Sequence, residues 1–204
     1  MTDPTRLDPF QSLTDRPESW PVEASADLHR DDWVVALRKD TIRAPGGEKE
    51  FGRLVLEHPG AVIVLALDDR ERVCLLSQYR HPAQHRFIEL PAGLLDGQGE
   101  SPLDVAKREL NEEAGLAAEE WTQVSTTYSS PGISAELMHL FVARGLSRAD
   151  SDFEPEHEEA EMARGWAPYA DVYDAVVAGR LTDGPLVQLV LLARARGLAG
   201  AVEG

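Results

Sequence analysis

The sequence predicts an α+β fold in which a mixed β-sheet lies between layers of helix. Strand-like segments stand before and after one well-marked helix in the middle of the chain, and two more helical segments follow near its end. With 204 residues, of which 43% are hydrophobic, the chain can bury one substantial core. We expect this core domain to occupy residues 59–204, after an N-terminal arm and a small strand-rich region over residues 1–58.

The N-terminal region is predicted to be an arm followed by two strands. Residues 1 to about 30 are polar and acidic and contain several prolines, which favours a loosely ordered arm. The segment DWVVALRKDTI, residues 32–42, predicts a strand. The turn APGGEKEF, residues 44–51, leads into a second strand, FGRLVLEH, over residues 51–58.

Two apolar segments come next and predict a β-hairpin. They are AVIVLAL, residues 61–67, and RVCLLSQYR, residues 72–80, joined by the turn DDRE. The apolar run in the first segment is continuous, which implies burial on both faces. The segment RFIELPAG, residues 86–93, then leads towards the central helix.

The central helix is predicted over residues 102–114 from signals at both ends. Ser101 suits an N-cap, Pro102 the first helical position and Asp104 the third position of a capping box, while Gly115 suits a left-handed C-cap. The apolar stripe that should face inward consists of Leu103, Ala106 and Leu110.

The C-terminal half continues with a strand, a loop, another strand and two helices. The strand LMHLFVA covers residues 137–143, and the long acidic loop SRADSDFEPEHEEAE covers residues 147–161. A strand is expected around ARGWAP, residues 163–168. The two helices are expected near residues 170–178 and 185–196.

Composition excludes several classes of partner. A formal net charge of −16 argues against binding to nucleic acid or to an anionic membrane. The sequence has no run of eighteen apolar residues and no signal-peptide pattern, so we expect a cytoplasmic protein. Cys74 lies in an apolar strand segment and is expected to be a buried, unreactive thiol, and the six histidines lack zinc-ligand spacing.

Three carboxylates share one side of the central helix. Residues three and four apart are neighbours on a helix, so Glu109 faces both Glu112 and Glu113, and like charges at this spacing repel. A solvated acidic face is one interpretation. The other is a Mg²⁺ site, because this ion takes oxygen ligands and joins carboxylates to substrate phosphates.

The segment GLLDGQGESPLDVAKRELNEEAGL, residues 93–116, resembles the Nudix box of the Nudix hydrolases. The match is complete from Glu100 onward, whereas the stretch between Gly93 and Glu100 is one residue longer than the family pattern. The extra residue falls in a glycine-rich turn, which can absorb it without moving the helix. The resemblance implies the α/β/α sandwich of that family.

Further motifs resemble the ADP-ribose pyrophosphatases of this family. They are LPAGLLD, QYRHP and Pro131, sixteen residues beyond Gly115, although a proline there also suits an ordinary turn. The resemblance implies Mg²⁺-dependent hydrolysis of ADP-ribose to AMP and ribose 5-phosphate, with Mn²⁺ as a possible substitute. It also implies a homodimer with exchanged N-terminal strands. The alternatives are hydrolysis of another nucleoside diphosphate sugar or a dinucleotide, and a non-catalytic sensor that binds ADP-ribose.

The resemblance also implies roles for individual residues. The expected metal ligands are Glu109 and Glu113, with Glu112 as a further, catalytic ligand and the backbone carbonyl of Ala92 as another. The residues expected to be structural within the motif are Gly93, Glu100, Arg108 and Gly115. The general base is expected in the acidic loop, at Glu158 or else at Glu159, although such loops are usually only solvated.

Four residues are candidates for contacts with the substrate. Arg80 and Arg53 can bind phosphates through paired hydrogen bonds, and Glu136 can accept one from a ribose hydroxyl. Trp33 can stack on adenine, with core packing as the alternative.

Overall fold

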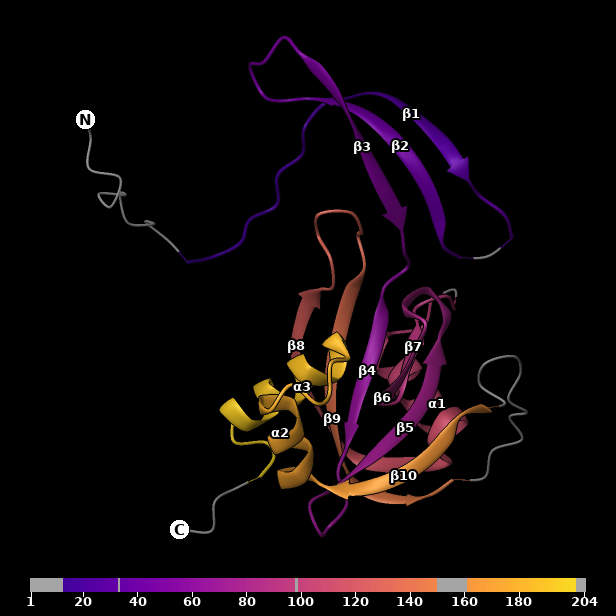
Figure 1. Ribbon diagram of the computed structural model, residues 1–204, viewed down its shortest axis with the longest axis vertical. Coiled ribbons are helices and arrows are strands. Elements are labelled where there is room, and N and C mark those ends of the chain that lie inside the picture. The colour runs from indigo at the N-terminus through magenta and orange to yellow at the C-terminus, as the bar shows by residue number, and fades with distance from the viewer. Residues whose placement is uncertain (1–12, 33, 98, 150–160, 201–204) are drawn as a thin grey trace, which may run out of the picture.

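A computed structural model describes residues 13–32, 34–97, 99–149 and 161–200 (Figure 1). The elements in chain order are β1 Val22–His29, β2 Ala36–Arg43, β3 Glu50–Glu57, β4 Ala61–Ala66, β5 Arg72–Arg80, the short 3₁₀ helix η1 His81–Ala83, β6 His85–Glu89, β7 Ala92–Leu94, α1 Pro102–Ala114, β8 Leu116–Tyr128, β9 Leu137–Arg148, β10 Ala163–Pro168, α2 Tyr169–Val177 and α3 Gly184–Ala195.

A four-stranded mixed sheet forms the centre of the molecule. Its strand order is β7-β4-β9-β8, in which β4 and β9 run parallel and the other neighbours run antiparallel. All six residues of β4 are buried, as its unbroken apolar run predicts.

Helices cover both faces of this sheet, which confirms the predicted α+β sandwich. On one face, Leu65 of β4 and Leu140 of β9 pack against apolar residues of α2 and α3. On the other face, Val64 and Phe141 pack against α1, and Cys74 is buried in the same cluster. Burial raises the pKa of the Cys74 thiol to about 11, so the thiol stays protonated at neutral pH.

The predicted hairpin over residues 61–80 is wrong in its pairing. Strand β5 lies in a second, three-stranded sheet of order β10-β5-β6, while β4 lies in the central sheet. Only an isolated bridge between Leu67 and Val73 joins the two strands where the chain passes between the sheets. This crossing brings the end of β5, at Arg80, and the end of β6, at Glu89, towards β7 and α1.

The N-terminal strands β1, β2 and β3 form a third sheet that stands apart from the helices, above the start of β4 in Figure 1. Residues 22–29, predicted as part of a loose arm, instead form β1, which pairs with β2. The predicted strand over residues 32–42 begins later, at Ala36.

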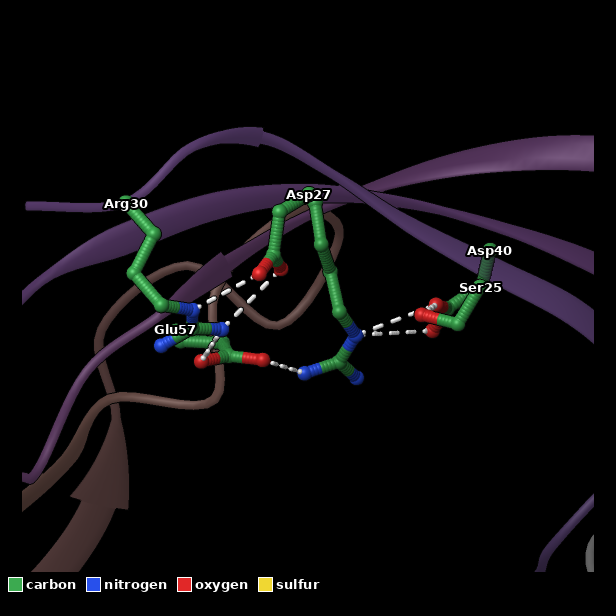
Figure 2. A network of polar contacts seen from close by, with 6 residues as sticks. Ser25, Asp27, Arg30, Asp40 and Glu57 are labelled. Atoms are coloured by element: carbon green, nitrogen blue, oxygen red, sulfur yellow. Dashed lines mark hydrogen bonds and ion pairs between the residues drawn. The ribbon is translucent and has the colours of Figure 1, made fainter.

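Ion pairs link the three strands of this N-terminal sheet. Arg38 pairs with Asp40 at 3.0 Å and also with Glu57 (Figure 2). Arg30 pairs with the same Glu57 at 2.6 Å and with Asp27 at 2.9 Å. Ser25 completes the group through a 2.7 Å hydrogen bond to Asp40. The network ties β1 and the exit of β3 to the central strand β2.

The described helices include none that is both long enough and apolar enough to cross a membrane.

Candidate active site

Helix α1 is fixed at both ends in the way its sequence predicts. The hydroxyl of Ser101 accepts a hydrogen bond from the Asp104 N–H at 3.2 Å, which caps the first turn. Gly115 ends the helix with a φ of 64°, and its N–H donates to the Asn111 carbonyl at 2.8 Å. Because the fully buried Leu110 anchors the apolar face, the acidic residues of α1 are held on a neighbouring face.

Two of these acids, Glu109 and Glu113, converge on the start of β7. The N–H of Ala92 donates to Glu113 Oε2 at 2.8 Å. The Glu109 carboxyl lies over Gly93, where an added Cβ would meet its Cδ at 2.0 Å and its Oε1 at 2.1 Å. The absence of a side chain at residue 93 thus makes room for the Glu109 carboxylate.

Arg108 lies among the remaining carboxylates. Its Nη1 is 2.8 Å from Glu109 Oε1 and 3.0 Å from Glu112 Oε2. Its Nη2 is 3.7 Å from Glu100 and 3.8 Å from Asp96. The guanidinium therefore offsets part of the repulsion between acids that the sequence places together.

The charge on Glu109 is only partly compensated by this arrangement. Burial raises the pKa of Glu109 to about 7, against the opposing effect of Arg108. In the described part of the chain, no three aspartate, glutamate, histidine or cysteine side chains gather closely enough to hold a metal ion. The donors are nevertheless carboxylate oxygens beside a buried carboxyl group that a cation would stabilise, so their type and charge fit a hard divalent cation.

Arg80 lies at the end of β5 and is paired with Glu89 of β6. Its Nε is 3.0 and 3.2 Å from the two carboxylate oxygens of Glu89, and its Nη2 is 2.6 Å from Oε2. Burial opposes the charge of Arg80, but the carboxylate of Glu89, with those of Glu113 and Asp183, raises the pKa of the guanidinium above its usual value. Arg80 is therefore a fixed cation near the acids of α1.

Glu136 lies in the loop between β8 and β9 and is held by its neighbours. The Ser129 hydroxyl donates to its carboxylate, and its own N–H donates to the Ser134 hydroxyl at 3.0 Å. His58 Nε2 faces Glu136 Oε1 at 3.8 Å, while its Nδ1 accepts from the Gly60 N–H. These contacts fix the Glu136 carboxylate beside the exit of the N-terminal sheet.

Arg53 is separated from this group within the chain. It lies on β3 in the N-terminal sheet, apart from α1 in Figure 1, and its guanidinium stacks on Phe51 at 4.5 Å. Trp20 meets the same Phe51 ring edge-on, with ring centroids 6.4 Å apart. Trp33, Glu158 and Glu159 lie outside the described residues.

The sequence analysis did not identify Glu89, Asp96 and His58, which contact Arg80, Arg108 and Glu136 respectively. Glu89 had a detectable signal, because a lone carboxylate in the apolar segment RFIELPAG requires a buried partner, and Arg80 ends the preceding strand. Asp96 and His58 lie in loops and carry no comparable signal.

Comparison with known proteins places the chain in a family. The model of the NUDIX domain matches residues 57–189, a span that runs from β4 into the first half of α3 and includes the whole acidic face of α1. The chain belongs to the Nudix family. The family resemblance of residues 93–116 is thus confirmed.

Several Nudix relatives are similar over most of this chain. An ADP-ribose pyrophosphatase of Mycobacterium tuberculosis is 41% identical over 162 residues, covering 79% of this chain and 77% of that protein. An ADP-ribose pyrophosphatase of Bacillus subtilis is 35% identical, covering 71% and 82%. A solved structure described as an ADP compounds hydrolase superposes with a TM-score of 0.72 at 20% identity, covering 91% of this chain and 98% of that one, which confirms the fold.

Proposed function

We propose that this Nudix protein hydrolyses the pyrophosphate of ADP-ribose to AMP and ribose 5-phosphate. The convergence of Glu109 and Glu113 on Ala92 and Gly93 is the observation that carries the chemistry, because it places two carboxylates of α1 against the start of β7. The similarity to ADP-ribose pyrophosphatases over more than two thirds of the chain supports the choice of substrate.

A divalent metal, Mg²⁺ or Mn²⁺ in its place, belongs to this proposal, since Nudix hydrolases generally use one. The residues that would hold it are Glu109, Glu112 and Glu113, together with the backbone carbonyl of Ala92. Such an ion neutralises the phosphoryl oxygens and favours attack by water on phosphorus. Arg108 keeps Glu109 and Glu112 in place from the side of the Asp96–Glu100 turn.

The other residues serve binding and proton transfer. Arg80, held beside Glu113, is proposed to bind a phosphate, and Glu136 is proposed to accept a hydrogen bond from a ribose hydroxyl. Glu158, or Glu159 beside it, is proposed to accept the proton of the attacking water. Arg53 is also proposed to bind a phosphate, and Trp33 is proposed to stack on the adenine of the substrate.

We also propose a homodimer with exchanged N-terminal strands, in which residues 1–58 form the dimerisation region and residues 59–204 the hydrolase domain. The exposure of all eight residues of β1 supports this, as does the projection of the N-terminal sheet away from the helices (Figure 1). In such a dimer, Arg53 would reach the site of the partner subunit, because it is separated from α1 within its own chain.

A second candidate substrate is another nucleoside diphosphate sugar. A protein of Yersinia enterocolitica described as a GDP-mannose pyrophosphatase is 29% identical over 147 residues. The acids of α1 handle the pyrophosphate that both substrates share, so these acids do not choose between them.

Product analysis by chromatography tests the proposal. The protein is incubated with ADP-ribose, ADP-glucose or GDP-mannose, each with Mg²⁺ and with chelator. We expect AMP from ADP-ribose in the presence of Mg²⁺ and little product from the other two. GMP formation faster than AMP formation would select the second candidate, and no product from any of the three would overturn the proposal.

A further inference from the structure

Glu89 is a buried ionisable residue at the end of β6, and its carboxylate is paired with Arg80. Its side chain is 7% exposed, while that of Arg80 is 48% exposed. Three contacts of 2.6 to 3.2 Å join the two groups through Nε and Nη2 of Arg80. Paired, charge-assisted hydrogen bonds of this kind fix the plane of a guanidinium as well as its position.

The strand register shows that the Arg80 side chain must adopt an extended rotamer to reach Glu89. In the ladder between β5 and β6, Arg80 lies opposite His85, and Glu89 lies opposite Leu76. The Arg80 side chain therefore runs back along its own strand to reach the carboxylate. A half-exposed arginine has many other rotamers in water, so the contact with Glu89 selects this one.

This rotamer directs the Arg80 guanidinium towards the acids of α1. Glu89 ends β6 three residues before Ala92, the residue whose N–H holds Glu113. Glu113 and Asp183 both act electrostatically on the Arg80 guanidinium. Among the described residues, the contacts with Glu89 use Nε and Nη2 of Arg80 and not its Nη1.

We propose that Glu89 is a positioning residue, which holds the Arg80 guanidinium by Nε and Nη2 so that Nη1 is presented to a phosphate of the substrate. This inference rests on the proposed hydrolysis of ADP-ribose. It assigns Glu89 a role in substrate affinity although its carboxylate never touches the substrate.

The test is the Glu89→Gln variant, assayed for kcat and KM with ADP-ribose and Mg²⁺. Glutamine keeps the shape of the side chain but loses the charge and one acceptor. The Arg80 side chain can then adopt other rotamers. We expect KM to rise about tenfold with kcat changed by less than about threefold, because binding to a phosphate is made in ground and transition states alike. If Glu89 acted only by repelling the phosphates, KM would fall instead, and that result would overturn the proposal.

A double-mutant cycle with Arg80→Lys separates positioning from general structural damage. Lysine lacks the forked guanidinium, so in its background Glu89→Gln should change KM by less than about twofold. Equal effects of Glu89→Gln in both backgrounds would show that Glu89 does not act through Arg80. Thermal unfolding of each variant without substrate identifies any loss of fold.

The ion pair between Arg72 and Asp68 offers a matched control at the opposite end of β5. Arg72 Nε is 2.8 Å and Nη2 2.7 Å from Asp68 Oδ2. We expect Asp68→Asn to leave KM within about twofold of wild type, and a tenfold rise there would contradict a local role for Glu89. A wild-type protein without turnover would defeat the proposed function itself, whereas an active wild type with an unchanged KM in Glu89→Gln would defeat only this inference.

Discussion

Gly93 shows how one residue sets the position of a carboxylate on another element. A Cβ at residue 93 would lie 2.0 Å from Cδ of Glu109, and the flexible Glu109 side chain can move away at little cost in stability. We therefore expect Gly93→Ala to lower kcat at least about tenfold, because a shift of about 1 Å at a reacting site can cost that much or more. Steady-state kinetics with ADP-ribose, and thermal unfolding, measure the two effects.

Gly165→Ala is the control for this prediction. Gly165 also lies in a strand, β10, and an added Cβ there meets nothing within 4 Å. Its kcat should match wild type. Similar losses in both variants would mean that a glycine-to-alanine change in a strand, rather than the displacement of Glu109, lowers activity.

The carboxylates of α1 should differ in importance because their surroundings differ. In Glu113→Gln the amide oxygen can still accept from the Ala92 N–H, so the fold should persist, but a neutral amide is a poorer metal ligand. We expect kcat to fall by roughly a hundredfold or more, since a catalytic metal contributes several kcal/mol. Glu112→Gln should cost less, because Glu112 pairs with Arg108, whereas Glu113 contacts the backbone of β7.

Measurement of Mg²⁺-dependent turnover in both variants shows which of the two residues contributes more to kcat. Near-normal activity in Glu113→Gln would show that the acids of α1 are not the metal site. A larger loss in Glu112→Gln than in Glu113→Gln would move the main ligand to the side of the helix that Arg108 occupies.

At the residue scale, the sequence predicts which side chains lie together on one helix, but it predicts poorly which side chains pair between strands. The acids of α1 follow from helical periodicity, which is local, and the caps at Ser101 and Gly115 are local too. The pair of Arg80 with Glu89 depends on a strand register that joins residues nine apart, and the sequence alone does not state that register.

Helix α3 begins at a carboxyl group whose ionisation depends on the fold. Asp183 caps the helix by accepting from the Leu186 N–H at 2.9 Å, and burial raises its pKa to about 6. Because this value lies above the ordinary 3.8, the folded state holds the proton more tightly than the unfolded state. The contribution of Asp183 to stability is therefore complete below about pH 4 and is lost as pH rises to about 6.

Asp183→Asn should keep the cap and remove this pH dependence, because asparagine is an equally good N-cap and carries no charge. We expect the variant to be more stable than wild type at pH 7 and to approach it near pH 4, as measured by urea unfolding at both pH values. Asp183→Ala should instead lose about 1 kcal/mol from the missing cap. A stability difference between Asp183→Asn and wild type that is the same at both pH values would contradict the raised pKa.

At the element scale, the errors in prediction come from strands. The hairpin expected over residues 61–80 fails because periodicity shows that a strand is buried but not which strand it pairs with. Strand β1 was missed although VEASADLH alternates apolar and polar residues, because the acidic, proline-containing context favoured an arm. The central helix and the last two helices could be predicted without knowing their partners, because helical periodicity is local and α1 and α3 also have side-chain N-caps.

At the scale of the whole molecule, the N-terminal sheet stands apart from the helices and leaves apolar side chains exposed. Its own ion pairs hold the three strands together, yet Val22, Leu28 and Leu54 are 56%, 54% and 46% exposed. Covering exposed apolar side chains of this kind is favourable, at roughly 25 cal/mol per Å² of apolar area buried. The proposed exchange of strands between two subunits would cover them.

Leu54→Glu tests this proposal, because a charge at that point in an apolar interface cannot be desolvated cheaply. We expect light scattering to give a mass of twice 22.4 kDa for the wild type and a mass close to 22.4 kDa for Leu54→Glu at low micromolar concentration. Val177→Glu is the matched control, since Val177 is 65% exposed on α2, far from the N-terminal sheet. If Arg53 reaches the site of the partner subunit, turnover in Leu54→Glu should fall together with the dimer fraction, and it should recover as protein concentration rises. A monomeric wild type, or a dimer that Leu54→Glu leaves intact, would place the interface elsewhere.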